Sequence, residues 1–254
     1  LYANGGKVAR SRPGEFQVGN PDAGVGVAVT MGITGNALFG GTGIVTATSF
    51  KLADGSDVGG VTSDAQYNTV GGTNSGDSFT GTDAIRNTLY GFDTGTAITT
   101  GDNNTLLGYN AGKAIIASSE NVIVGSDAGS GANQSTASRN VIIGYQAIQN
   151  QDNPNDQVAI GYRAMANQKD DASGNVALGS YALECSTNQE VHFNTVIGMY
   201  AGQKAESGFG QNVLVGYSAG QYVNNCDYCT AVGYLAMRGT SSPKIQGNHN
   251  TAHG

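Results

Sequence analysis

A short pattern recurs nine times in this chain of 254 residues and constrains its fold more than any other feature. It consists of an asparagine, three apolar or β-branched residues, a glycine, two variable residues and an alanine, as in NVIVGSDA from Asn121. Successive glycines are separated by 17 residues (Gly91 to Gly108) to 19 residues (Gly125 to Gly144). Self-similarity at a nearly fixed period is the signature of a repeat architecture. Positions within a repeat are counted below from this glycine, so that −1 is the residue before it.

The three residues before each glycine predict a short strand. They read VIV, VII, VAL or TVI, which are β-branched or aliphatic residues, and these runs are too short for a helix. A unit of this length with two short strands and two turns is one coil of a parallel β-solenoid, in which coils stack about 4.8 Å apart. We therefore expect an all-β protein with a parallel β-solenoid over residues 85–254, about nine coils and about 40 Å long, whose last coil is incomplete.

Each recurring residue has a chemical reason for its place in the coil. The glycine is expected to turn the chain with a positive φ or to let two backbones approach closely. The asparagine at −4 can hydrogen-bond through its side-chain amide to the coils on either side, as a ladder. The turn glycines are Gly108, Gly125, Gly144, Gly161, Gly179, Gly198, Gly216 and Gly233, after a first one at Gly91. The ladder asparagines are Asn104, Asn121, Asn140, Asn175, Asn194 and Asn212, with Gln157 and Cys229 at the same position of two other coils.

Two further positions carry information about the surface. An aromatic residue stands at +1 in six of the nine coils and predicts a stripe of rings along one edge, formed by Phe92, Tyr109, Tyr145, Tyr162, Tyr217 and Tyr234. Side chains alternate between the two faces of a strand, and we expect position −1 to face the interior and position −2 to face outward. Position −2 is apolar in every coil, and a strand that is apolar on both faces is usually buried on both.

An apolar column that faces outward is expected to be shielded from solvent by other protein atoms. Another segment of this chain could supply this shielding, but we expect the column to meet copies of the same chain around an axis, as a homotrimer. A coil this small also has little core of its own. The predicted trimer-interface residues are Leu106, Ile123, Ile142, Val196 and Leu214.

Composition limits the partners of the chain. The formal net charge is −7, only 12% of residues are charged, and the sequence has no cluster of Lys and Arg. We therefore expect no nucleic-acid partner, because such surfaces need dense positive charge. No run of eighteen apolar residues is present, so we expect no membrane insertion. The chain opens without Met and closes inside a repeat, so we expect it to be part of a longer polypeptide.

Residues 1–84 do not follow the repeat and are rich in Gly, Thr and Asp. Short β-prone pieces occur at 26–31 (GVAVTM), 43–50 (GIVTATSF) and 67–72 (YNTVGG). We expect an irregular β-rich shaft or attachment region here, with a flexible linker as the alternative. Asn68-Thr69-Val70 resembles the opening of a repeat, so the end of this region could be a degenerate first coil.

Few residues suggest chemistry. Cys226 and Cys229 have C-x-x-C spacing, and packing, a disulfide within the loop or between chains, and a metal or redox site (also drawing on Cys185) all remain open. His249 and His253 could gather around a metal on a trimer axis or simply be exposed. The loop carboxylates Asp102, Asp152, Asp156, Asp170 and Asp171 are read as solvated turn residues, because a glycosidase needs two carboxylates across a groove and a calcium loop needs a defined spacing.

The longest loops, 149–156, 166–174, 184–193 and 221–228, are the better candidates for binding, because function collects on loops held by a rigid scaffold. One polar and aromatic set has the composition of a sugar-binding surface, although ordinary inter-coil turns would look the same. The candidate receptor contacts are Tyr222, Asn224, Asn225, Asp227 and Tyr228.

The repeat N-x-V-x-I-G-x-x-A resembles the head repeats of YadA-like trimeric autotransporter adhesins, which are trimers of left-handed parallel β-rolls. The stretch NTLYGFDTGTAITTGDNNTLLGYNAG is similar to repeats in bacteriophage tail fibres, and GTGIVTATSF resembles segments of marine-phage fibre proteins. The repeat likeness covers residues 85–254 and the second likeness residues 40–60.

This resemblance implies a left-handed β-roll in a homotrimeric fibre segment of a virion, a structural and adhesive protein that attaches to a host surface. Its expected partners are a bacterial surface glycan or protein and other virion tail proteins. It implies no cofactor and no enzymatic activity. A bacterial trimeric adhesin head, at the cell surface, is the alternative, and a glycan-degrading tailspike enzyme is a further one. The heptad stalk and membrane anchor of an adhesin do not occur in this sequence.

Overall fold

The computed structural model describes four short strands near the N-terminus and residues 62–254, except 80–82, 132–133, 169–171, 186–190, 206–207 and 242–244. The chain divides into two units, Leu1–Phe50 and Lys51–Gly254. In the first unit β1 (Tyr2–Ala3) pairs with β2 (Gly6–Lys7), and β3 (Arg10–Arg12) pairs with β4 (Glu15–Gln17), both antiparallel. The strands expected at 26–31 and 43–50 lie outside the described residues.

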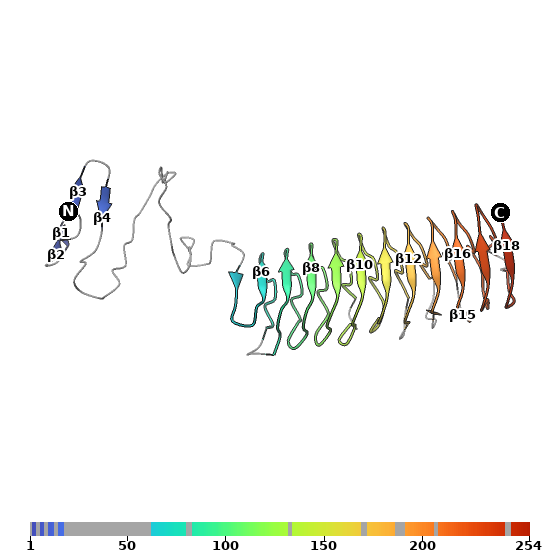
Figure 1. Cartoon of the computed structure of the whole chain (residues 1–254), viewed down its shortest axis with the longest axis horizontal. Coiled ribbons are helices and arrows are strands. Elements are labelled where there is room, and N and C mark those ends of the chain that lie inside the picture. The colour runs from blue at the N-terminus through green and yellow to red at the C-terminus, as the bar shows by residue number, and fades with distance from the viewer. Residues whose placement is uncertain are drawn as a thin grey trace. The chain divides into compact units, whose positions relative to one another are not determined.

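The second unit is a parallel β-solenoid, as the repeat predicts (Figure 1). One strand from each coil joins a single sheet, whose strands follow chain order and pair parallel from β6 onward. The described residues contain no helix. The strands of this sheet are β5 (Thr62–Ser63), β6 (Thr69–Gly71), β7 (Thr88–Tyr90), β8 (Thr105–Leu107), β9 (Val122–Val124), β10 (Val141–Ile143), β11 (Val158–Ile160), β12 (Val176–Leu178), β14 (Thr195–Ile197), β16 (Val213–Val215), β17 (Thr230–Val232) and β18 (Thr251–His253).

The strands pair so that equivalent repeat positions lie side by side. Val141 is the partner of Val158, and Ile142 is the partner of Ala159. A second wall of the coils is less regular and contains β13 (Val191–His192), which pairs parallel with β15 (Phe209–Gly210). In-register stacking places each repeat position in one column along the axis, so that a column behaves as a single surface feature.

The solenoid begins one coil earlier than the expected boundary between residues 84 and 85. Strand β6 pairs parallel with β7, and the Asn68 side chain accepts a hydrogen bond from the Asn87 backbone N–H at 2.8 Å. The preceding strand β5 pairs antiparallel with β6, so the parallel part of the sheet starts at β6. At the other end, β18 pairs parallel with β17, so the last repeat opening also forms a strand of the sheet.

The asparagine column forms a buried hydrogen-bonded ladder. The backbone N and the side-chain Nδ2 of Asn121 both donate to Oδ1 of Asn104, at 3.1 and 3.0 Å. The same Nδ2 also donates to the carbonyl of Ala137 in the next coil, at 2.9 Å. Each ladder amide therefore joins three coils, and the pattern satisfies polar groups that would otherwise be buried without partners.

The turn glycines are required by both conformation and space. Gly108 has a φ of 134°, and a Cβ there would lie 2.6 Å from the carbonyl oxygen of Gly125. Comparable values recur along the column, so the backbones of neighbouring coils touch at this corner. No residue with a side chain fits such an approach without moving the backbone.

Candidate functional site

The outward face of the main sheet differs from the sequence prediction. The side chains at position −2 point into the solenoid and are 0 or 1% exposed in the single chain. The predicted interface residues Leu106, Ile123, Ile142, Val196 and Leu214 are therefore core residues, and assigning them to a trimer interface is wrong. Position −2 lies on the same strand face as the inward-pointing ladder amide at −4, since alternate residues share a face.

Positions −3 and −1 face outward instead, and together they form the outer sheet face. Column −1 is apolar from β7 to β17, and Leu107 and Ile197 are 47% and 39% exposed. Column −3 consists of valine and threonine, with Val213 40% exposed. The columns are Thr88, Thr105, Val122, Val141, Val158, Val176, Thr195, Val213 and Thr230 at −3, and Tyr90, Leu107, Val124, Ile143, Ile160, Leu178, Ile197, Val215 and Val232 at −1.

No charged residue occurs in either column. Nine strands about 4.8 Å apart, and about 10 Å of width, give an apolar face of roughly 400 Å². A continuous apolar patch of this size is comparable with the largest patch on a typical soluble monomer, which is often a functional contact surface. The outer sheet face is therefore the strongest candidate for an interaction surface on the described part of the chain.

A row of aromatic rings runs along the edge of this face. Phe92 stacks on Tyr109 with ring centroids 5.7 Å apart, as the +1 spacing predicts. In the later coils the row is continuous because tyrosines at +2 fill the coils that lack one at +1. The ring centroids are 5.1 to 5.9 Å apart through Tyr145, Tyr162, Tyr181, Tyr200, Tyr217 and Tyr234. Most neighbouring rings are stacked, whereas Tyr162 and Tyr181, and Tyr200 and Tyr217, meet edge to face.

A second row of side chains, all hydrogen-bonded, was not predicted. Glu184 is only 4% exposed, and it accepts hydrogen bonds from Arg163 Nε at 2.9 Å and Gln203 Nε2 at 2.8 Å. Gln203 Oε1 accepts from Gln221 Nε2 at 2.8 Å, and Gln221 Oε1 accepts from Arg238 Nε at 3.1 Å. Arg163 Nη1 also donates to Gln146 Oε1 at 3.3 Å, so the row spans six coils from Gln146 to Arg238. Its residues are variable repeat positions, which is why the repeat pattern gave no sign of them.

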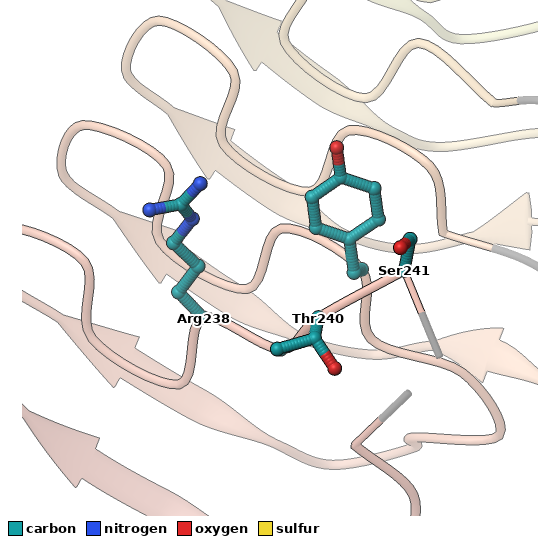
Figure 2. A pocket seen from close by; sticks show the side chains of 5 residues that line it. Arg238, Thr240 and Ser241 are labelled. Carbon is teal, nitrogen blue, oxygen red and sulfur yellow. The ribbon is translucent and has the colours of Figure 1, made fainter. Parts of the chain in front are cut away.

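The last arginine of this row borders a hollow of about 470 Å³ lined by Tyr222, Arg238, Gly239, Thr240 and Ser241. Figure 2 shows Arg238, Thr240 and Ser241 following one another along one loop at its edge. Gly239 allows the backbone of this loop to approach that of Tyr222 closely, because a Cβ at this position would lie 2.7 Å from the carbonyl oxygen of Tyr222.

The five candidate receptor contacts do not form one surface. Tyr222 lines the hollow, whereas Tyr228 stacks on His249 with ring centroids 4.8 Å apart. Asp227 Oδ1 accepts a hydrogen bond from the Gly210 backbone N–H at 2.8 Å, so it serves coil-to-coil contact. The backbone N–H of Asn224 donates to the carbonyl of Ile245, and Asn225 is exposed.

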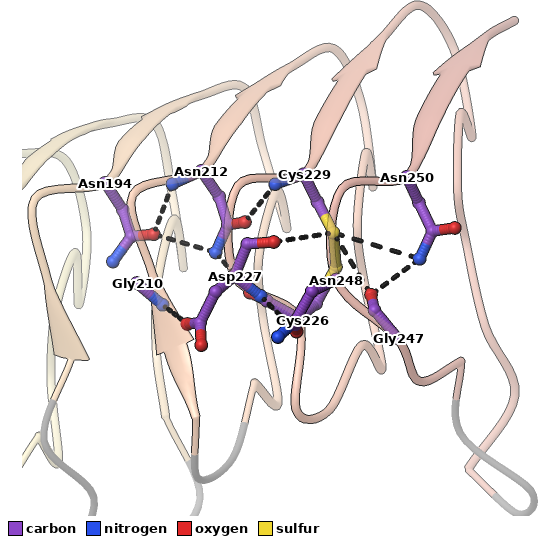
Figure 3. Close-up of a disulfide and its surroundings, with 9 residues drawn as sticks. All are labelled: Asn194, Gly210, Asn212, Cys226, Asp227, Cys229, Gly247, Asn248 and Asn250. Atoms are coloured by element: carbon purple, nitrogen blue, oxygen red, sulfur yellow. Dashed lines mark hydrogen bonds between the residues drawn. A yellow bond between two sulfur atoms is a disulfide. The ribbon is translucent and has the colours of Figure 1, made fainter.

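Cys226 and Cys229 form a disulfide within one loop at the ladder corner (Figure 3). The Cys229 backbone N–H donates to Asn212 Oδ1 at 2.7 Å, so the ladder reaches this coil. A disulfide sulfur has no proton, however, so Cys229 supplies no side-chain donor to the next coil. Cys185 is a free thiol in the core, where burial raises its pKa to about 12 and makes it unreactive.

Two of the carboxylates expected in turns, Asp102 and Asp156, serve contacts between coils. Asp102 Oδ1 accepts a hydrogen bond from the Ile85 backbone N–H at 2.8 Å, and Asp156 pairs with Arg139 at 2.7 Å. Asp170 and Asp171 lie outside the described residues. Within the described ranges, no three His, Cys, Asp or Glu side chains cluster as a metal site would require, and His253 is exposed in β18.

No family model, curated protein or solved structure matches this chain. Among the residues placed by the structure, no helix is long and apolar enough to span a membrane.

Proposed function

We propose that this chain is a structural and adhesive segment of a homotrimeric fibre, in which three copies meet through their outer sheet faces. The observation that supports this proposal is the uncharged outer sheet face, apolar along column −1 and composed of valine and threonine in column −3. The sequence argument for self-association therefore applies to positions −3 and −1 instead of −2. A flat column repeated every 4.8 Å is self-complementary, because each copy offers the same period to the others.

The setting we propose is a phage tail fibre or related virion appendage that attaches to a bacterial surface, with a bacterial trimeric adhesin head as the second candidate. The likeness of the repeats supports this setting. The Cys226–Cys229 disulfide is consistent with either, because disulfides persist mainly outside the reducing cytoplasm. The rod carries out no chemistry in this proposal. New reducing ends released from host polysaccharide by the protein would overturn that part of it.

Analytical ultracentrifugation tests the assembly. The wild-type chain should sediment as a trimer at micromolar concentration, and Ile197→Asp should dissociate it because a carboxylate would be buried without a partner. Ile116→Asp is a matched control, because Ile116 is similarly exposed (42% against 39%) but lies outside the outer sheet face. A stable wild-type monomer would contradict the proposal and would favour a cover supplied by another segment of this chain.

Attachment is tested separately with fluorescently labelled protein and candidate host bacteria. We expect the labelled trimer to bind intact cells and to lose binding after the surface polysaccharide is stripped. Binding that is equal on stripped cells would point to a protein receptor, and no binding to any tested cell would contradict the adhesive role while leaving the assembly result in place.

A further inference from the structure

The hollow beside Arg238 has features that the outer sheet face lacks: a fixed cation, hydroxyl groups and an aromatic ring. We infer that it binds a carboxylate-bearing sugar unit of a surface glycan, with the Arg238 guanidinium holding the carboxylate. The inference deepens the proposed attachment role and rests on it for its biological meaning, but its geometry stands on the residues below.

Side chains of the preceding coils orient the guanidinium of Arg238. Its Nε donates to Gln221 Oε1 at 3.1 Å, and Gln221 is held in turn by Gln203 at 2.8 Å. Gln203 donates to the buried Glu184 at 2.8 Å. Successive side chains on neighbouring coils therefore fix the orientation of the guanidinium before any ligand arrives, which lowers the entropy lost on binding.

The outer edge of this guanidinium is uncompensated. Of the carboxylates in the part of the chain that the structure describes, none pairs with Arg238, whereas Arg139 and Arg163 pair with Asp156 and Glu184. The two Nη groups of a guanidinium form a planar fork that matches a carboxylate with two parallel hydrogen bonds. An arginine that is oriented but unpaired is thus prepared for an external anion.

The rest of the lining suits a sugar more than a bare anion. The hollow of about 470 Å³ lies within the range of small-ligand sites and is larger than an inorganic ion needs. The aromatic ring of Tyr222, which lines the hollow, can pack against the C–H groups of a sugar, and the hydroxyl of Ser241 can exchange hydrogen bonds with sugar hydroxyls. The hollow is shallow and the chain carries a net charge of −7, so we expect millimolar affinity for one sugar unit, raised by repetition in an oligomer.

Titration of the wild-type protein with glucuronic acid, followed by NMR or calorimetry, tests the inference. We expect saturable binding that weakens at least tenfold in Arg238→Gln, and also weakens in Arg238→Lys because the ammonium lacks the planar fork. Glucose, which lacks the carboxylate, and acetate, which lacks the sugar, should each bind at least tenfold more weakly than glucuronic acid.

Arg86→Gln is the matched control. Arg86 Nε donates to Asn103 Oδ1 at 2.7 Å across the same separation of 17 residues that joins Arg238 to Gln221. It is therefore an arginine of the same kind, held by an amide of a neighbouring coil, but it does not line the hollow. Glucuronic acid should bind Arg86→Gln as it binds the wild type.

Equal binding of glucuronic acid by wild type and Arg238→Gln, or no binding by wild type, would overturn the inference. Acetate binding as tightly as glucuronic acid would also overturn it, because the site would then hold only an anion. These outcomes are independent of sedimentation, so a trimer that binds no glucuronic acid would leave the proposed assembly in place and remove only this site.

Discussion

The middle coils of the solenoid fill their interior differently from the coils on either side. In the flanking coils with turn glycines at Gly91, Gly108, Gly198 and Gly216, position +4 is a glycine, as at Gly112, and position +7 is an apolar core residue, as at Ile115. In the middle coils, which begin at Gly144, Gly161 and Gly179, position +4 is a buried Ile148, Met165 or Leu183. The core residue that follows in these coils is Gln151, Gln168 or Cys185.

The two kinds of coil also differ in the hydrogen bond that the backbone carbonyl at +4 accepts. In the flanking coils the N–H at +7 donates to the carbonyl at +4, at 3.2 Å from Ile115 to Gly112. In the middle coils the carbonyls of Ile148 and Leu183 accept a side-chain amide of the preceding coil instead, Gln134 Nε2 and Gln168 Nε2, each at 3.1 Å. The buried glutamines therefore replace a backbone turn bond.

This replacement has a cost. Ile148 and Leu183 adopt φ values of 47° and 52°, which are unfavourable for residues with large side chains. The Oε1 atoms of Gln134, Gln151 and Gln168 are buried and have no partner among the described residues. One solenoid can therefore fill its interior with two different arrangements of side chains. The arrangement of the middle coils leaves some buried polar atoms without hydrogen bonds.

The turn glycine is common to both kinds of coil, so changing it should cost the same in each. Gly161→Ala and Gly108→Ala would place a Cβ 2.4 and 2.6 Å from a backbone oxygen, at φ values of 139° and 134°. We expect each to lower the free energy of unfolding by about 3 kcal/mol or more. Urea denaturation of both variants checks this. A cost under about 1 kcal/mol in only one of them would show that the turns differ as well.

Ile98→Gln should be the most harmful change at position +7. A glutamine at +7 reaches the +4 carbonyl of the next coil, which for residue 98 is the carbonyl of Gly112. That carbonyl is already bonded to the backbone N–H of Ile115, so the new amide would have no free acceptor. Lost apolar burial and an unpaired amide together should cost about 3 to 5 kcal/mol. Thermal unfolding of this variant against wild type measures the effect, and a near-neutral result would mean that any coil accepts glutamine.

Gln168→Leu is the reciprocal change and should cost much less, about 1 to 2 kcal/mol. It removes the amide bond to the Leu183 carbonyl but also removes a buried Oε1 that has no partner. The same thermal unfolding experiment applies. If this variant is destabilised as much as Ile98→Gln, the glutamine contributes more than the replacement of a turn bond.

Gln157→Asn should be slightly stabilising, by up to about 1 kcal/mol. Gln157 is the one glutamine in the ladder column; its Oε1 accepts the Asn175 backbone N–H at 3.0 Å, and its Nε2 donates to the Ala172 carbonyl. Elsewhere in the ladder, as at Asn121, the Nδ2 also donates to the preceding Oδ1. A shorter side chain should add that bond in this coil, and a fall in the melting temperature would contradict the expectation.

The smallest effect concerns Arg139 and Asp156, which occupy the same column as Arg86 and Asn103, where the acceptor is a neutral amide. The guanidinium lowers the pKa of Asp156 below its ordinary 3.8. Because the folded pKa is the lower one, the pair adds stability above about pH 4 that is lost as the pH falls through the folded pKa. Asp156→Asn should flatten the pH dependence of unfolding below pH 4, and only slightly, since both groups are exposed.

The fold could be predicted from the sequence because the period is explicit and each coil is local. Nine glycines at spacings of 17 to 19 residues, with a β-branched run before each, leave little choice except a solenoid. The phase of the strands was predicted wrongly because three consecutive apolar residues show no alternation. Threonine at −3, as in Thr105, was the missed signal, since it suits an exposed face and places −1 outward with it.

The row from Gln146 to Arg238 and the glutamines of the middle coils could not be predicted in the same way. They occupy positions where the repeat varies, and their partners lie one coil away at separations from 14 to 21 residues. Such contacts depend on loop lengths that differ between coils. A repeat pattern determines the columns, but not which side chains within a column reach one another.

The close stacking of the coils also determines how much chain the solenoid needs for each step along its axis. An extended chain of 18 residues could reach about 60 Å, whereas one coil of similar length advances the rod by only about 4.8 Å. More than nine tenths of the contour length therefore runs around the solenoid axis and not along it. What the protein gains is a surface that repeats at molecular spacing: lengthening the gene by one unit adds one more row of the same outer valines, rings and turns, without redesigning those already present.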